Sequence, residues 1–297
     1  MADGDTATVE IIGTRGDYFL TSGKGFQGKV ELALSPQGML DVPITTIWNE
    51  TAFGWGARWG GMRYNRRDLV LGFNILGDTA SEWQDNNDSF RSNWSYTEDS
   101  TIRVTTEKWG TRELRCRLTE ATEEKMERDP RIWAKSELVL TLTAGWPFWT
   151  QEDDTYEFET VGSAQSFTFP GVNETDMPAY PVFVLDAPGI WTLPDRSYGS
   201  DEWGRFGIDA NRNITMPALT SVGITVNYDP TEETIVADDG SQIWGLLQSE
   251  PLYAIPPQAG IADDPVNLPV SVTGASAGAA CQVRIPRNFQ RPWGLAG

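Results

Sequence analysis

Histidine is absent from the 297 residues of this chain. Hydrolases of the Ser-His-Asp and Cys-His types need an imidazole, and so do His-ligated zinc sites and histidine pH switches. The lack of this one residue type therefore excludes all four classes. Hydrophobic residues make up 39% of the chain and charged residues 22%, which is ordinary for a chain that folds into a globular protein.

Cysteine is nearly absent as well, with Cys116 and Cys281 far apart in the sequence. Each lies in an alternating run, LRCRL and CQVRI, in which the cysteine shares one face of a strand with apolar neighbours. Buried thiols in a β core are favoured over a disulfide or a catalytic nucleophile. Two cysteines provide neither a secretory disulfide framework nor a metal cluster.

Basic residues are scarce. The chain has 23 lysines and arginines against 42 acidic residues, so its formal net charge is −19. This excess argues against nucleic acid or an anionic membrane as the main partner. Residues 1–5 are acidic rather than cationic and apolar, and no apolar run approaches the ~20 residues of a membrane span. We expect a soluble protein that is made in a cytoplasm.

The two halves of the chain differ in composition. Residues 1–150 hold 22 acidic and 17 basic residues, whereas residues 151–297 hold 20 acidic and 6 basic ones, all arginine. Prolines divide as 4 and 14, and tryptophans as 9 and 4. We therefore predict two domains, residues 1–150 and 151–297, joined by a linker around residues 145–148 and 152–154.

The first half alternates between apolar and polar residues as a β domain does. Short runs with strand character lie at residues 9–11, 30–34, 69–73, 102–104 and 138–142. Thr79 and Glu82 form a capping box, and Trp83, Phe90 and Trp94 follow at helical spacing. These residues predict one helix of 12–15 residues near 79–94. Residues 120–126, ended by Asp129-Pro130, are a weaker helical candidate.

The second half is predicted to be nearly all β. Its short strands lie at residues 166–169, 182–185, 224–228, 233–236 and 270–272, and turn residues separate them. The turn chemistry of Asp229-Pro230 and Asp238-Asp239-Gly240 favours a hairpin. Many short strands with proline-rich turns indicate a sandwich or jelly roll.

Three motifs match the sequence patterns of known sites but lack the context that those sites need. Residues 23–28, GKGFQG, match a dinucleotide-binding pattern, but the segment that follows is a strand where the cofactor site needs a helix. Residues 209–213 copy the start of a calcium loop, yet the turn glycine and the final glutamate are Ile214 and Thr220. Adjacent acidic pairs, which a histidine-free glycosidase would need, are favoured as solvated surface. An enzyme stays the minority interpretation, and no cofactor or metal is expected.

A cluster of tryptophan, glycine and arginine lies between residues 48 and 67. Trp48 is followed by the loop FGWGARWGG, which contains Trp55 and Trp59, and then by Arg63, Arg66 and Arg67. Trp, Tyr and Arg are enriched at protein interfaces, and glycines between aromatics build a poor independent core. We predict that residues 53–68 form an assembly surface. The alternative is a loop that folds back on its own domain.

The second half contains a distinctive succession of segments, which begins with GVNETDMPAYPVFV at residues 171–184 and continues through TVNYD, VADDG and YAIPP. VSVTGASAGAAC follows at residues 270–281, and the chain then has IPRNFQRPWG near its end. This succession resembles the C-terminal domain of siphophage distal tail proteins, and the ending is similar to minor tail proteins of actinobacterial phages. The first half fits less specifically, so that the resemblance spans about residues 60–297.

The resemblance implies a non-enzymatic virion protein at the tail tip. Members of this family form a hexameric ring of identical copies that connects the tail tube protein to the tail-tip hub protein, with the tape measure protein as a further possible partner. The N-terminal belt domain makes the ring, and the C-terminal domain is a galectin-like or carbohydrate-module-like β-sandwich. The expected fold is thus mainly β, with two β-sandwich domains and one packed helix in the first. The alternative function is a carbohydrate-binding tail protein. Trp191 and Trp203 lie in polar loops and are candidates for stacking on a saccharide, but a position in the core or at its rim is favoured for both, and the resemblance assigns no sugar-contact residue.

Overall fold

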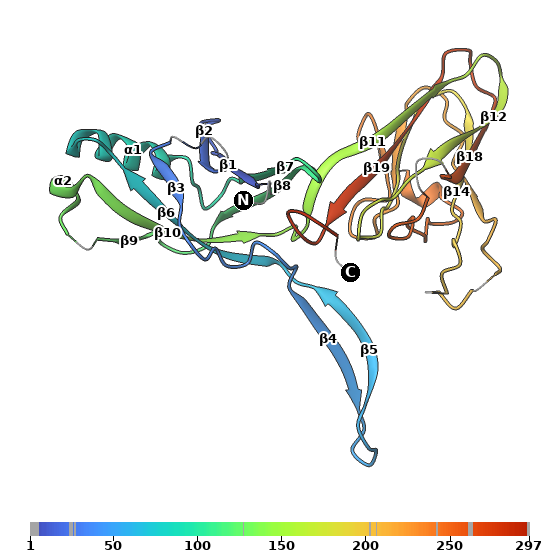
Figure 1. Cartoon of the computed structure of the whole chain (residues 1–297). Coiled ribbons are helices and arrows are strands. Elements are labelled where there is room, and N and C mark those ends of the chain that lie inside the picture. The colour runs from blue at the N-terminus through green and yellow to red at the C-terminus, as the bar shows by residue number, and fades with distance from the viewer. Residues whose placement is uncertain are drawn as a thin grey trace. The chain divides into compact units, whose positions relative to one another are not determined.

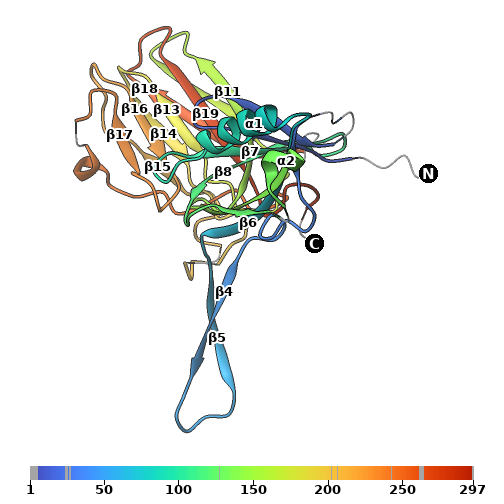
Figure 2. The ribbon, with the colours of Figure 1, turned by 90° about the vertical axis from the view of Figure 1, so that its left-hand side faces the viewer.

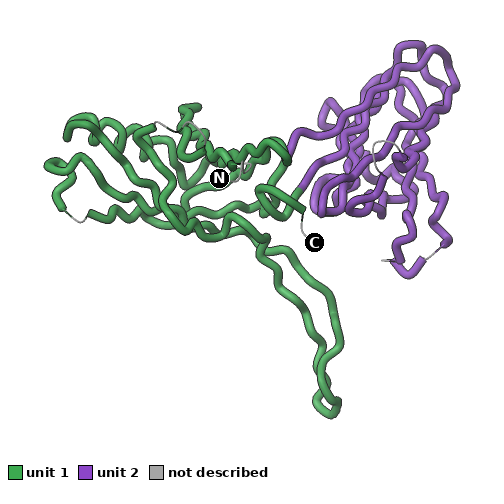
Figure 3. Tube along the Cα trace, viewed as in Figure 1, with its two compact units in different colours: residues 1–150, 289–297 green, residues 151–288 purple. Residues whose placement is uncertain are grey.

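The chain divides into two compact units in the computed structural model (Figure 3). Unit 1 comprises residues 1–150 and 289–297, and unit 2 comprises residues 151–288. The structure describes residues 6–23, 26, 28–126, 128–201, 203–205, 207–241, 243–260 and 264–295. Strand β11 (Trp149–Glu159) leads out of unit 1, and strand β19 (Ala280–Phe289) leads back into it. Residues 289–297, which the composition assigned to the second domain, therefore belong to unit 1.

Unit 1 is built from antiparallel strands around one apolar core (Figure 1). The strands are β1 (Thr8–Ile12), β2 (Tyr18–Ser22), β3 (Val30–Leu32), β6 (Arg67–Leu76), β7 (Ser100–Thr106), β8 (Gly110–Leu118), β9 (Glu123–Lys125) and β10 (Lys135–Ala144). One group pairs in the order β2-β1-β7-β8, and another in the order β3-β6-β10-β9. Inward residues of both groups share the core, among them Leu71, Phe73, Ile102 and Leu140.

Helix α1 (Ala80–Ser92) confirms the predicted helix. Thr79 caps its first turn by accepting a hydrogen bond from the Glu82 amide at 3.2 Å, and the Glu82 carboxylate accepts one from the Asp78 amide at 2.6 Å. Trp83, Phe90 and the following Trp94 are all buried in the core of unit 1. The 3.6-residue spacing of these aromatics therefore placed the helix and its buried face correctly.

The second helical candidate was wrong. Within residues 120–126 the chain forms strand β9, which pairs with β10, and the helical turn α2 (Pro130–Trp133) begins at the proline that was expected to end a helix. Proline fits the first position of a helix because its missing N–H has no partner there anyway. The Asp129 carboxylate caps this turn by accepting a hydrogen bond from the Arg131 amide at 2.9 Å.

Unit 2 consists of two antiparallel sheets with a common core. Besides β11 and β19, its strands are β12 (Ala164–Gly171), β13 (Val182–Leu185), β14 (Ile190–Pro194), β15 (Asn213–Thr215), β16 (Ile224–Asn227), β17 (Ile235–Ala237) and β18 (Val266–Thr273). The sheet orders are β17-β16-β13-β19-β11 and β12-β18-β14-β15. Phe183 and Val283 of the first sheet and Trp191 and Val270 of the second belong to one buried cluster. The mainly β fold is confirmed.

Both cysteines lie inside these cores. Cys116 on β8 and Cys281 on β19 are free and have no exposed surface. Burial raises the pKa of both thiols. No helix among the described residues is long and apolar enough to cross a membrane.

Candidate assembly interface

Residues 44–64 form a two-stranded hairpin that belongs to unit 1. Strand β4 (Ile44–Glu50) pairs with strand β5 (Ala57–Tyr64), and the two make a sheet of their own. Figures 1 and 2 show them as an isolated ribbon that leaves the other strands of the unit. All seven residues of β4 are exposed. An isolated two-stranded hairpin is marginally stable in water, so this one lacks the support that a third strand or a packed helix would supply.

One face of the hairpin carries most of its large apolar side chains, together with Thr46 and Glu50. The register sets Thr46 opposite Met62 and Trp48 opposite Trp59, with an irregularity between Ile47 and Trp48. Paired residues share a face, so Met62, Trp48 and Trp59 lie together, and Ile44 extends the row toward the root. The Trp48 and Trp59 rings meet edge to face with centroids 5.4 Å apart.

Most charges of the hairpin lie on the opposite face and at the root, although Glu50 shares the face of Trp48 and the exposed Ile47 shares the face of the arginines. Arg58 and Arg63 lie on the polar face, where Arg63 Nη2 donates to Asn65 Oδ1 at 2.9 Å. Arg66 is exposed at the root, with Nε 3.3 Å from an oxygen of Asp68. Open hollows on either side of Arg66 are lined by further arginine and aromatic residues, namely Arg63, Tyr64, Tyr96, Arg115, Arg117 and Trp146.

The tip of the hairpin is the most exposed aromatic surface in the described part of the chain. Phe53 and Trp55 are fully exposed, and Trp59 is 55% exposed. The structure thus places this loop on an exposed hairpin, and its role as an assembly surface stays a prediction. Four residues predicted for the assembly surface, Trp55, Trp59, Arg63 and Arg66, are exposed on the hairpin or at its root.

Arg67 does not belong to this surface. It is the first residue of β6, has no exposed area, and donates hydrogen bonds to backbone carbonyl oxygens inside unit 1. Burial lowers the pKa of its guanidinium to about 10. The sequence placed it beside Arg66 without revealing that the strand alternation turns one side chain out and the next in.

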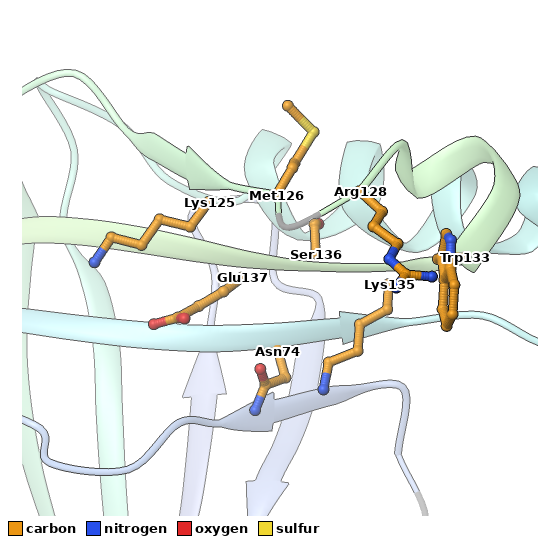
Figure 4. Close-up of a pocket in the computed structure, with 8 residues that line it drawn as sticks. All are labelled: Asn74, Lys125, Met126, Arg128, Trp133, Lys135, Ser136 and Glu137. Atoms are coloured by element: carbon orange, nitrogen blue, oxygen red, sulfur yellow. The ribbon is translucent and has the colours of Figure 1, made fainter.

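A basic hollow on unit 1 was not predicted from the sequence (Figure 4). It has a volume of about 500 Å³ and is lined by Asn74, Lys125, Met126, Arg128, Trp133, Lys135, Ser136 and Glu137. The Arg128 guanidinium lies 4.2 Å from the centre of the Trp133 ring. Three cations and one carboxylate give the lining a charge opposite to that of the chain, so it attracts acidic groups of a partner.

The two saccharide candidates in unit 2 have different environments. Trp191 is fully buried, and its indole Nε1 donates to the Asp186 carbonyl at 2.9 Å, so it is a core residue. Trp203 is 49% exposed and donates to the Leu252 carbonyl at 3.1 Å. The favoured interpretation of a core tryptophan is therefore confirmed for Trp191, whereas Trp203 is half-exposed.

The residues that resembled the start of a calcium loop have a structural role in unit 2. The Asp209 carboxylate accepts hydrogen bonds from Arg205 Nε at 2.6 Å and from the Tyr253 hydroxyl at 2.8 Å. The hydrogen bond from Arg205 is the main cause that lowers the pKa of Asp209. Among the described residues no group of three or more Asp, Glu or Cys side chains is arranged to hold a metal ion.

The chain is similar to known proteins of phage tails. No family model matches the chain. Two curated proteins named minor tail protein Gp27, from Mycobacterium phages D29 and L5, are each 26% identical to it over 97% of this chain and 98% of theirs. The chain resembles phage tail proteins over nearly its whole length.

Two solved structures share the fold. The SPP1 Dit (gp 19.1) protein, described as a paradigm of the hub adsorption apparatus of phages that infect Gram-positive bacteria, matches with a TM-score of 0.58 and 16% identity over 95% of this chain and 99% of that one. A chain of the activated phage P2 baseplate matches with a TM-score of 0.51 and 10% identity over 96% and 99%. At these identities the likeness concerns the fold alone. The predicted resemblance to siphophage tail proteins is confirmed, and the sequence relatives support a structural role in a tail.

Proposed function

We propose that this protein is a distal tail protein that forms a ring at the tail tip and connects the tail tube to the tail-tip hub. The tail proteins that match nearly all of its length support this function. The observation that carries it is the exposed hairpin of unit 1, where Trp48, Trp59 and Met62 on one face are each about half exposed and are not covered by the described residues of their own unit. A protein with such a face needs a partner in the assembled state.

A neighbouring copy in a ring is the partner that we propose for this face. Identical subunits that present one surface and receive it on another form a closed ring when the rotation between them closes. The tip residues Phe53 and Trp55 and the cross-strand pair Trp48–Trp59 have the composition of interface hot spots. Arg63 and Arg66 at the root add donors for carboxylates on an acidic neighbour.

We propose that catalysis has no part in this function. The relatives that match the chain are named as tail proteins. Asp209, the acidic residue with the lowered pKa described above, is engaged by Arg205 and Tyr253. Both observations favour a protein whose chemistry consists of contacts between subunits.

The test is the double substitution Trp55→Ala and Trp59→Ala. We expect the wild-type protein to form rings with a central opening in negative-stain images, and the double variant to sediment as a monomer at the same concentration. Removing two aromatic anchors costs about 2 kcal/mol or more each at a hot spot, which is enough to dissociate a ring at micromolar concentration.

Trp244→Ala is the matched control for this test. Trp244 lies in the short 3₁₀ helix of unit 2 (Trp244–Leu246) and is 55% exposed, the same fraction as Trp59. We expect this variant to form rings like the wild type. Rings of unchanged size from the double variant, or a wild-type protein that stays monomeric at every concentration, would contradict the proposal.

A further inference from the structure

Residues 289–295 form a segment, here called the strap, that returns from β19 and packs into unit 1. Phe289 is buried in the core of the unit, and Leu295 packs against the same core. Between them the chain bends, with Gly294 at a φ of 71°, in the left-handed region that glycine adopts without strain. Unit 1 therefore contains a part that is far from the rest of it in the sequence.

Two buried arginines hold the strap by its backbone. Arg112 on β8 donates from Nη1 to the carbonyl oxygens of Arg291 and Gly294, both at 2.8 Å, and its guanidinium lies 3.6 Å from the centre of the Phe289 ring. Arg67 donates from Nη2 to the Gln290 carbonyl at 2.7 Å. Hydrogen bonds from a charged donor are stronger than neutral ones, and burial shields them from water.

The same Arg67 guanidinium holds the root of the hairpin. Nη1 donates to the carbonyl oxygens of Gly38 at 2.9 Å and of Met39 at 3.1 Å, shortly before β4 begins, while Arg67 itself follows the end of β5. The backbone at Gly38 lies very close to the backbone at Asp68, because a Cβ at Gly38 would lie 2.1 Å from the Asp68 carbonyl oxygen. Arg67 thus joins both ends of the hairpin to each other and to the strap.

A salt bridge repeats this connection at the surface. Arg291 of the strap lies with Nε 2.6 Å from Oδ1 of Asp41, which precedes the hairpin by three residues. Both side chains are partly exposed, so the pair alone contributes little. Its position shows that the strap contacts the segment that leads into β4 through side chains as well as through Arg67.

We infer that the strap positions the assembly hairpin, with Arg67 as the positioning residue that connects them. Among the described residues no third strand pairs with the hairpin, and Tyr64 at its root packs against Phe148. The direction of the hairpin is therefore set at its root, and the strap is one of the segments that complete the root. The inference rests on the proposed function only in naming the hairpin as the assembly element. The dependence of the hairpin on the strap is a separate property that is measurable in a monomer.

The experiment compares a variant that lacks residues 290–297 with one that lacks residues 296 and 297. The first loses the strap carbonyls and Arg291 but keeps Phe289 in the core, whereas the second keeps the whole strap. A dye on a cysteine introduced by Thr51→Cys reports motion of the hairpin tip through its anisotropy decay. Ser221→Cys, exposed on unit 2, serves as the reference position.

We expect faster dye motion at position 51 only when residues 290–297 are removed, and no change at position 221. Tryptic cleavage after Arg58 and Arg63 should become about tenfold faster. Of the hydrogen bonds that the deletion removes, the one from Arg67 to the Gln290 carbonyl joins the strap to the hairpin root, and the loss of one charge-assisted hydrogen bond shifts an opening equilibrium by about that factor. Arg112→Met in the full chain, which releases the strap without shortening the chain, should change both readouts in the same direction.

Unchanged dye motion and unchanged cleavage in both altered chains would overturn the inference. If the shortened chain fails to fold, Arg112→Met alone decides it. These outcomes are distinct from those of the proposed function. Rings that persist after Trp55→Ala and Trp59→Ala would refute the hairpin as the assembly element, but the dependence of the hairpin on the strap would stand. If the rings are lost in that double variant while dye motion and cleavage stay unchanged in the strap variants, only the role of the strap is refuted.

Discussion

Helix α1 and the hairpin are two aromatic-rich segments of unit 1 that differ in the exposure of their aromatic side chains. In and just after the helix, Trp83, Phe90 and Trp94 are buried, and the Phe90 ring centre lies 4.8 Å from that of Phe73 on β6. In the hairpin, Trp55 is fully exposed, and Trp48 and Trp59 contact each other edge to face while more than half of each side chain stays exposed. Large apolar side chains lower the free energy wherever they leave water, so the first group stabilises the fold and the second is available to stabilise an assembly.

The difference lies in what surrounds each aromatic row. The aromatics of α1 repeat at the helical period, so that one face is apolar and meets the strands of its own unit. The row on the hairpin is framed by glycines and arginines, and the described part of unit 1 packs no second layer against it. An aromatic row alone therefore predicts burial, but not whether the surface that buries it belongs to the same chain.

Thiol labelling should give the largest contrast between the core and the hairpin. Cys116 and Cys281 are buried and burial raises the pKa of both thiols, so almost no thiolate is exposed at neutral pH. A cysteine introduced by Thr51→Cys at the hairpin tip should react with a maleimide more than about a thousandfold faster than Cys116 and Cys281. The two native thiols become accessible only when their unit unfolds.

The measurement is mass spectrometry of the labelled protein over time, first in buffer and then in denaturant. All three thiols should react at similar rates once the protein is unfolded. Rapid labelling of Cys116 or Cys281 in the native protein would mean that the core of that unit opens readily, and the contrast with the hairpin would be lost.

Trp83→Ala should give the next largest effect. Trp83 is 7% exposed, and its Nε1 donates to the Ser136 hydroxyl at 3.0 Å, so the substitution leaves a cavity and an unpaired hydroxyl. We expect the free energy of unfolding of unit 1 to fall by about 3–5 kcal/mol in chemical denaturation. A loss below about 1 kcal/mol would show that α1 contributes little to the core.

The sequence predicted elements better than it predicted their surroundings. Alternation and the capping box of Thr79 and Glu82 depend on neighbours within a few residues, so the strands that alternation predicted and α1 were placed correctly. Strands β4 and β5 were not predicted, and part of the expected loop at residues 53–61 belongs to β5. The segment at residues 120–126 was misjudged because β9 gains its stability from pairing with β10, a contact distant in the sequence. Tertiary pairing overrides local preference in such short segments.

In the candidate site, too, local sequence predicted the residues better than it predicted their surroundings. Trp55, Trp59, Arg63 and Arg66 were placed on one surface by composition, and the structure exposes all four on the hairpin or at its root. Arg67 was included because it is their neighbour, but its carbonyl partners include Gln290, 223 residues away. No local signal marks a partner at that distance, and the strap was undetectable for the same reason.

Trp55→Ala, the same chemical change as Trp83→Ala, should give the smallest change in stability. The side chain is fully exposed in the monomer, so the free energy of unfolding should shift by no more than about 0.5 kcal/mol. The unfolding must be measured below the concentration at which copies associate, because association stabilises the folded state by mass action. At higher concentration the variant should associate at least about tenfold more weakly, since an aromatic anchor at an interface contributes there what Trp83 contributes to the core. A large loss of monomer stability would instead mean that Trp55 packs within its own chain, and the distinction between the two aromatic rows would fall.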